Sequence, residues 1–401
     1  MSLLEKASLI VTPNAYKTSK LYSIKPTDGS GDMNVVRATT ATRVNADGLI
    51  ESVGINVPRL DYSGGGCPSI LVEPQRTNLL TYSEQFDNAS WSKAFSGTGL
   101  IPVVTSNIGL SPSGTNTADR VILNKGNGTS DSDYSMITVS FTTLTNLDYT
   151  NSFFLKSFDG TPQTVRVWSI NLANFIDITL GSEWVRVSRT SLPQGTYGFI
   201  RFGLRGSTNQ NADVLVWGAQ LEAGANATSY IPTVASSVTR NAEGISKTGI
   251  SDLIGQTEGT LYAEFSTKNI TSGVKRILGI KSSNNQNIIA LRIINNGNLG
   301  ATVVSNGSII YNNQVNVSLT NNTFFKISAT YTNTRIKMFV NGILVLESGV
   351  VNFSPNELLS ILALGISEQN LATEIIDGNI KNSFIFKTAL TDEQCINLTT
   401  I

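Results

Sequence analysis

Residues 335–346 have the sequence pattern of a β-hairpin: Arg335-Ile-Lys-Met-Phe-Val340, then Asn341-Gly342, then Ile343-Leu-Val-Leu346. Successive side chains of a strand point to opposite faces, so Ile336, Met338 and Val340 form one apolar row. Asn-Gly is the strongest short signal for a two-residue turn, because both central residues of a type I′ turn need positive φ. The segment therefore predicts two antiparallel strands joined by a tight turn.

The same alternation recurs in short runs that are separated by Gly, Asn and Asp residues. These runs are residues 164–169, 184–188, 199–204, 213–217, 259–265, 288–294 and 324–330. Many short strands with turn signals between them predict antiparallel sandwiches. The expected fold is therefore all-β: an N-terminal extended strand-and-loop docking region followed by two antiparallel β-sandwich (jelly-roll) domains.

The expected boundaries follow changes in this pattern. Residues 1–77 alternate short apolar pieces with turn clusters, which indicates an extended docking region, with a small independent domain as the alternative. Residues 78–235 are expected to form the first sandwich, 236–258 a polar linker, and 259–401 the second sandwich.

Helix is expected at one place. Thr391-Asp-Glu-Gln394 is a capping box, and Leu390 with Cys395 stands where a hydrophobic staple would pack. Cys395 is therefore expected to be a buried apolar residue, and a disulfide to Cys67 is the less favoured alternative.

Composition argues against several classes of partner. The 401 residues carry 29 basic and 29 acidic side chains, and only 14% of the chain is charged. Without a Lys/Arg run the chain is not expected to bind nucleic acid, and without ~18–20 consecutive apolar residues it is not expected to insert into a membrane. Glu5 and Lys6 interrupt the N-terminal apolar run, so we expect synthesis in a cytoplasm.

Two stretches resemble known families. Phe339-Val-Asn-Gly342, Ala363-Leu-Gly365 and the segments 377–386 and 388–394 resemble laminin-G-like, concanavalin-type jelly rolls. The segments 74–86, 217–224 and 229–233, with Trp91, resemble the sandwich of tailed-phage head-spike and fibre proteins, which is similar to carbohydrate-binding modules. The second resemblance implies a virion location, on capsid or tail, and a homo-oligomer, expected to be a homotrimer.

No catalytic residue is expected. The chain has no histidine, which excludes Ser-His-Asp and Cys-His machinery and His-ligated metal sites. Jelly-roll glycosidases pair two carboxylates, but no Glu-x-Asp occurs, and Glu374 with Asp377 would point to opposite faces of a strand. No cofactor or metal is expected, with a structural Ca²⁺ held by Asp131, Asp133 or Asp377 as the open alternative.

Four residues are candidates for ligand binding. Arg166 and Trp168 lie opposite the Val165/Val167 row, and Arg201 and Arg205 lie opposite the Ile200/Phe202/Leu204 row. If both strands belong to one sheet, these four side chains line a groove that suits glycans. The alternative is that Trp168 packs under a loop and the arginines are solvated. Trp184 and Trp217 are expected to be structural, and for Trp91 both a structural and a ligand-binding role are open.

The leading hypothesis is a capsid-attached head fibre or spike. Its N-terminal region would dock to other virion proteins, and its sandwiches would bind host-surface or mucus glycans. The alternatives are a tail fibre or receptor-binding protein and, less favoured, a jelly-roll enzyme that degrades polysaccharides.

Overall fold

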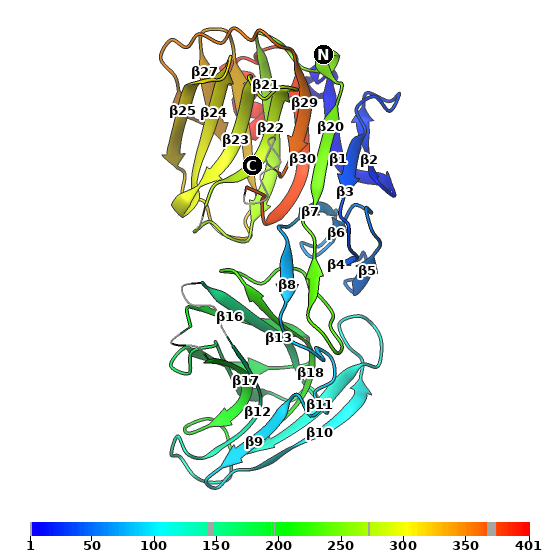
Figure 1. Cartoon of the computed structure of the whole chain (residues 1–401), viewed down its shortest axis with the longest axis vertical. Helices are drawn as coiled ribbons and strands as arrows, with labels where there is room; N and C mark the ends of the chain where they lie inside the picture. The colour runs from blue at the N-terminus through cyan, green and yellow to red at the C-terminus, as the bar shows by residue number, and fades with distance from the viewer. Residues whose placement is uncertain (1, 143–146, 194, 196, 272, 367–373) are drawn as a thin grey trace. The chain divides into compact units, whose positions relative to one another are not determined.

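A computed structural model (Figure 1) describes the chain except for residues 1, 143–146, 194, 196, 272 and 367–373. The chain divides into two compact units. Unit 1 consists of residues 1–48, 52–75 and 241–401, and unit 2 of residues 49–51 and 76–240. The all-β fold class is confirmed, because nearly every regular element is a strand and the strands pair antiparallel.

Unit 2 is a sandwich of two five-stranded sheets. One sheet has the order β10 (Leu100–Gly109), β11 (Ala118–Asn124), β18 (Asn211–Ala223), β13 (Tyr149–Ser157), β16 (Val185–Ser191). The other has the order β15 (Phe175–Leu180), β14 (Gln163–Trp168), β17 (Tyr197–Arg205), β12 (Tyr134–Thr142), β9 (Ser92–Ser96). A short pair, β8 (Arg76–Asn78) with β19 (Val238–Arg240), belongs to the same unit.

The core of unit 2 lies between the two sheets. Each sheet contributes the inward row of its alternating strands, and the fully buried members include Val121, Phe153, Val214, Val165, Val167, Ile200, Phe202 and Leu204. The predicted inward rows of 164–169 and 199–204 are therefore confirmed. Their opposite faces, which carry the candidate residues, point away from this core.

Unit 1 contains one sheet of sixteen strands that encloses a second core. Its main path is β25 (Ser308–Asn316), β24 (Asn298–Ser305), β23 (Ile288–Ile294), β22 (Lys275–Ser282), β29 (Leu359–Leu364), β20 (Gly244–Thr248), β3 (Met33–Val36), β2 (Lys20–Lys25), β1 (Leu9–Lys17), β30 (Gly378–Phe386), β21 (Gly259–Thr267), β26 (Phe325–Tyr331), β27 (Ile336–Val340), β28 (Ile343–Glu347). β7 (Ser69–Val72) pairs with β30, and β6 (Leu60–Asp61) pairs with β7. Buried side chains from both halves of this path form one cluster, so the halves face each other.

The hairpin at 335–346 is confirmed. β27 and β28 pair with Val340 opposite Ile343, and Asn341 and Gly342 have φ of 47° and 81°. Ile336, Met338 and Val340 are buried.

The N-terminal segment differs from the expected docking region. β1 pairs with β30, and β7 pairs with the same strand, so residues 1–75 supply strands and core side chains to the sheet of unit 1. The expected linker 236–258 also differs: β19 belongs to unit 2, and β20 pairs with β3 and β29. Pairing between segments distant in sequence leaves no local pattern, so these boundaries were not visible.

The remaining elements are short. They are α1 (Leu3–Lys6), α2 (Asp392–Thr399), the 3₁₀ turns Ser251–Leu253 and Asn295–Gly297, and the strands β4 (Ala41–Val44) and β5 (Ile50–Val53). The predicted capping box at Thr391 and Gln394 is present, and Cys395 packs with Leu390 in a buried cluster. Cys67 is exposed, and both cysteines are free thiols.

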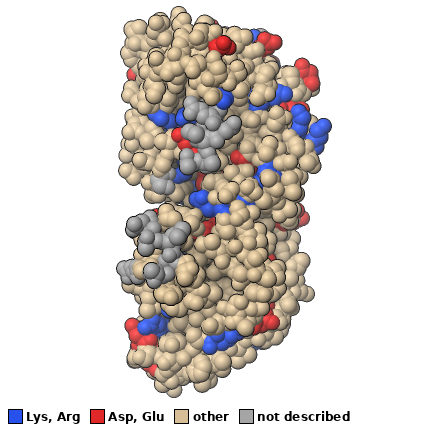
Figure 2. All heavy atoms as spheres, in the orientation of Figure 1, with Lys and Arg blue, Asp and Glu red and all other residues tan. Residues whose placement is uncertain are grey.

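The face drawn in Figure 2 shows charged side chains in small groups among uncharged ones, as the composition suggests. In the described part of the chain, no helix has the length and apolarity that crossing a membrane requires.

Candidate functional site

The candidate site of unit 2 starts from one strand pairing. β14 and β17 are neighbours, with Arg166 opposite Gly203 and Trp168 opposite Arg201. Directly opposed residues share a face, and residues two apart on a strand share it as well. Arg166, Trp168, Arg201 and Arg205 therefore all lie on the outer face of the same sheet.

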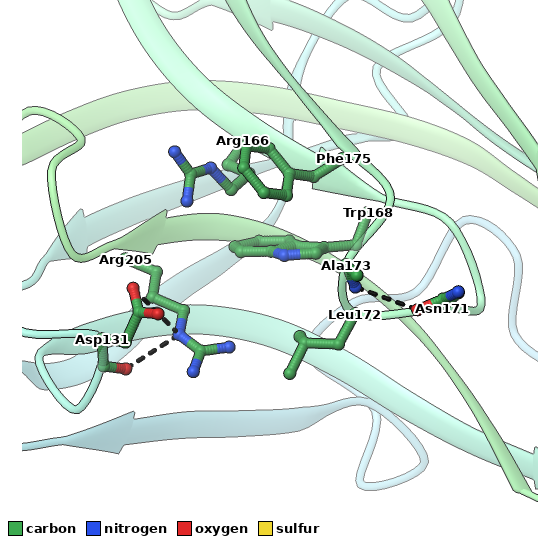
Figure 3. A pocket seen from close by; sticks show the side chains of 8 residues that line it. All are labelled: Asp131, Arg166, Trp168, Asn171, Leu172, Ala173, Phe175 and Arg205. Carbon is green, nitrogen blue, oxygen red and sulfur yellow. Dashed lines mark hydrogen bonds and ion pairs between the residues drawn. The ribbon is translucent and has the colours of Figure 1, made fainter. Parts of the chain in front are cut away.

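Three of these four residues line a pocket of about 380 Å³. It is formed by Asp131, Arg166, Trp168, Asn171, Leu172, Ala173, Phe175 and Arg205. Figure 3 shows the indole ring of Trp168 between Phe175 and Leu172, with Arg205 and Asp131 at one end. Arg201 is not part of the lining, so the structure brings together three of the predicted residues and leaves the fourth beside them.

Arg166 is fixed by the neighbouring strand β15. Its Nε and Nη2 donate to the two carboxylate oxygens of Asp177 at 2.6 and 2.8 Å. Its guanidinium also lies 3.8 Å from the ring centroid of Phe175. A bidentate pair with a cation–π contact holds a side chain rigidly, so Arg166 acts as a wall of the pocket and keeps the Phe175 ring in place.

The exposed aromatic ring of the pocket is Phe175 and not Trp168. Trp168 is 1% exposed, whereas Phe175 is 42% exposed. The sequence left open whether Trp168 lines a glycan groove or packs under a loop, and the structure places the ring in a buried position among its neighbours. Trp168 supplies an apolar floor, and Phe175 and Leu172 offer the accessible apolar surface.

The two other arginines make this face electropositive. Arg205 Nε donates to the backbone oxygen of Asp131 at 2.8 Å and lies 4.0 Å from its carboxylate. Burial, together with the nearby charge of Arg205, lowers the pKa of Arg201 to about 10. In the described part of the chain, neither arginine has a close bidentate carboxylate partner of the kind that Arg166 has. This face therefore favours acceptor-rich or anionic ligand groups.

Sequence reasoning missed Phe175, Asp177 and the loop residues 171–173. Asp177 stands opposite Arg166 and Phe175 opposite Trp168 across the β14–β15 pair. A second alternating run, Phe175-Ile-Asp-Ile-Thr-Leu180, begins seven residues after Trp168 and was the available signal.

The other tryptophans are structural. Trp217 is buried and Trp184 packs against the same cluster, as expected. Trp91, for which the sequence left both roles open, is buried in the sandwich core, and its Nε1 donates to the backbone of Tyr82 at 2.9 Å.

The acidic candidates have structural contacts. Glu374 forms an ion pair with Arg276 at 2.7 Å. Asp133 accepts hydrogen bonds from the backbone of Thr98 and Ser130, and the first of these bonds is the main cause that lowers its pKa. Asp377 is buried and immediately precedes β30. Within the described ranges, no three side chains of the His, Cys, Asp or Glu type group as a metal site would require.

The clearest similarity to a known family lies in unit 1. Residues 241–395 match the family Laminin_G_3, described as the concanavalin A-like lectin/glucanases superfamily. This part of the chain is similar to lectin-type jelly rolls. The resemblance that the sequence indicated over 259–401 is thereby confirmed and extends upstream to include β20.

Solved structures with a related arrangement are distant. A CBM40 domain of the Ruminococcus gnavus IT-sialidase, bound to alpha2,6 sialyllactose, is 17% identical, with 39% of this chain and 92% of that chain covered and a TM-score of 0.33. Domain 4 of a GH43 extracellular arabinanase from Geobacillus stearothermophilus, in complex with arabinotriose, is 16% identical, with coverages of 44% and 84% and a TM-score of 0.31. Similarity this low says nothing about what the present chain binds. No curated protein matches the sequence.

Proposed function

We propose that the protein is a non-enzymatic adhesion protein that binds glycans in the pocket of unit 2. The observation that carries this proposal is the combination of an exposed aromatic ring, an aliphatic side chain and one arginine only distantly paired with a carboxylate around a pocket of about 380 Å³: Phe175, Leu172 and Arg205. Pockets of this size with few polar groups on an apolar base are typical of small-ligand sites. The match of residues 241–395 to a superfamily of lectins and glucanases lies in unit 1, and it supports a carbohydrate ligand for the chain without indicating the pocket of unit 2.

We further propose that the protein belongs to a tailed-phage particle, as a capsid-attached head fibre or spike. The support is the resemblance of the segments 74–91 and 217–233 to phage head-spike and fibre proteins. A homotrimer would multiply weak single-site binding through effective concentration. A tail fibre or receptor-binding protein is the alternative, and immunogold labelling of intact particles separates the two locations.

The glycan proposal is tested with the full chain on a panel of immobilised host-surface and mucus glycans. Phe175→Ala should lower binding at least tenfold, because it removes the exposed ring. Phe95→Ala is the matched control, since Phe95 is 50% exposed on β9, at the other edge of the same sheet. If both variants bind glycans as tightly as the unaltered protein, the pocket of unit 2 is not the glycan-binding site.

Docking to the particle is tested by surface substitutions. A chain without residues 1–77 loses strands β1, β2, β3 and β7 and is expected to unfold unit 1. Ile24→Asp with Val36→Asp changes two exposed apolar residues of β2 and β3 and should block incorporation. Ile343→Asp with Val350→Asp, also exposed, should not.

The enzyme alternative has its own readout. Turnover on a panel of polysaccharides that a single carboxylate substitution abolishes would favour a jelly-roll glycosidase over an adhesion protein.

A further inference from the structure

Unit 1 contains a second pocket, of about 260 Å³, beneath the glycine-rich loop between β6 and β7. Four parts of unit 1 line it. The loop contributes Ser63, Gly64, Gly65 and Cys67, the ends of β21 and β30 contribute Ser266, Lys268, Asn379 and Lys381, and the segment before β26 contributes Asn322 and Phe324. β7 and β21 both pair with β30, so the pairing itself brings these groups together.

Two ammonium groups face this pocket. Lys268 Nζ lies 2.7 Å from the buried carboxylate of Glu73, which also pairs with Arg59 at 2.8 Å. Glu243 in turn pairs with Arg59 and Arg37. In this network three cationic side chains share two carboxylates, and Lys268 is the member that lines the pocket.

Lys381 is the more available cation. Its Nζ lies 4.0 Å from the centroid of the Phe324 ring and 4.0 Å from the carboxylate of Glu264. Glu264 is already engaged, because it accepts a hydrogen bond from Asn382 at 2.7 Å. A cation held over an aromatic ring and only distantly paired can accept an anionic partner at small cost in desolvation.

Polar groups of the kind that recognise hydroxyls surround the two lysines. Ser69 and Ser266 are buried serines of the lining, and the buried Oδ1 of Asn379 has no hydrogen-bond partner among the described residues. A buried acceptor without a donor costs free energy, which a ligand hydroxyl would recover. The pocket is smaller than the roughly 300–1,000 Å³ of sites for drug-sized ligands, so it suits one sugar ring and not an extended chain.

We propose that this pocket, independently of the one in unit 2, binds a single acidic sugar. Lys381 and Lys268 hold the carboxylate of a uronic acid, Phe324 contacts the ring, and Asn379 accepts from a hydroxyl. This goes beyond adhesion through the unit 2 pocket, because it assigns a second ligand of defined charge to unit 1.

The test is a calorimetric titration of the full chain with methyl β-D-glucuronide at low ionic strength. The expected affinity is at least tenfold higher than for methyl β-D-glucoside. Lys381→Gln should weaken glucuronide binding at least tenfold. Lys387→Gln, at an exposed lysine just beyond the other end of β30, should leave it unchanged.

Other outcomes overturn the proposal. They are absent binding, equal affinity for glucoside and glucuronide, unaltered binding by Lys381→Gln, or full competition by inorganic sulfate at the same concentration, which would indicate an anion site without sugar recognition. Phe175→Ala should leave glucuronide binding intact, so failure of the unit 2 proposal and failure of this one are distinguishable.

Discussion

Arg59 Nη2 lies 2.7 Å from Glu243 Oε2, and both side chains are excluded from solvent. The pair joins the N-terminal part of unit 1 to the segment that leads into β20. Glu243 also pairs with Arg37 at 3.1 Å, and its Oε2 accepts the backbone N–H of Glu73 at 3.0 Å. The network therefore connects three distant segments in the interior of one unit.

Glu243→Gln should destabilise unit 1 by about 3–5 kcal/mol, because it leaves buried guanidinium groups without their carboxylate. Amide hydrogen exchange in β1 and β30 measures this effect. All four tryptophans lie in unit 2, so the midpoint of tryptophan fluorescence in urea should change little.

The matched control for that variant is Glu347→Gln. Glu347 pairs with Arg335 at 2.5 Å, but both side chains are substantially exposed. Exposed pairs contribute about 0–1 kcal/mol, so exchange should hardly change. An equal loss of hydrogen-exchange protection in both variants would show that the buried Glu243 network stabilises unit 1 no more than an exposed ion pair does.

Gly342→Ala should destabilise unit 1 by about 1–2 kcal/mol, because a Cβ is disfavoured at left-handed φ. Gly342 has φ of 81° in the β27–β28 turn. Gly349→Ala is the control, since a Cβ there meets no atom within 4 Å and φ is not in the left-handed region. Hydrogen exchange in β27 measures both variants, and a neutral Gly342→Ala would argue against a type I′ turn.

Asp119 should make unit 2 less stable as pH rises from about 4 to about 6. The carboxylate accepts backbone N–H groups of Phe86 and Asn107, yet burial raises its pKa to about 6. In this window the folded state retains a proton that the unfolded chain has lost, so deprotonation costs stability.

Asp119→Asn has no such titration. Between about pH 4 and about pH 6, the free energy of unfolding of the Asp119→Asn variant should rise relative to that of the unaltered protein by roughly 3 kcal/mol at most. Tryptophan fluorescence in urea measures this free energy. A difference that stays constant between pH 4 and pH 7 would contradict the raised pKa.

The two thiols should react at very different rates with Ellman's reagent. Cys67 is exposed, whereas Cys395 is buried and burial raises its pKa to about 11. The thiolate is the reactive form, so the native protein should show one fast thiol, and the second should appear only in denaturant. Cys67→Ser should abolish the fast phase, and its persistence would contradict the burial of Cys395.

The candidate site was visible in part from sequence. Alternation fixes which residues share a strand face, so Arg166 with Trp168 and Arg201 with Arg205 were found without coordinates. Phe175 was missed because it belongs to the next strand, and its position opposite Trp168 depends on register. The burial of Trp168 depends on packing that no local pattern records.

The sequence by itself determined the local features of this protein: the strands, the Asn341–Gly342 turn, the capping box at Thr391 and the composition of each sheet face. These depend on φ preferences and on a period of two residues, which act between near neighbours. Only the tertiary structure decided that β1 and β7 join β30, that Arg59 meets Glu243, and that Lys268 and Lys381 face one pocket. Such contacts join residues far apart along the chain, and the free energy that selects them comes from burying a whole core together.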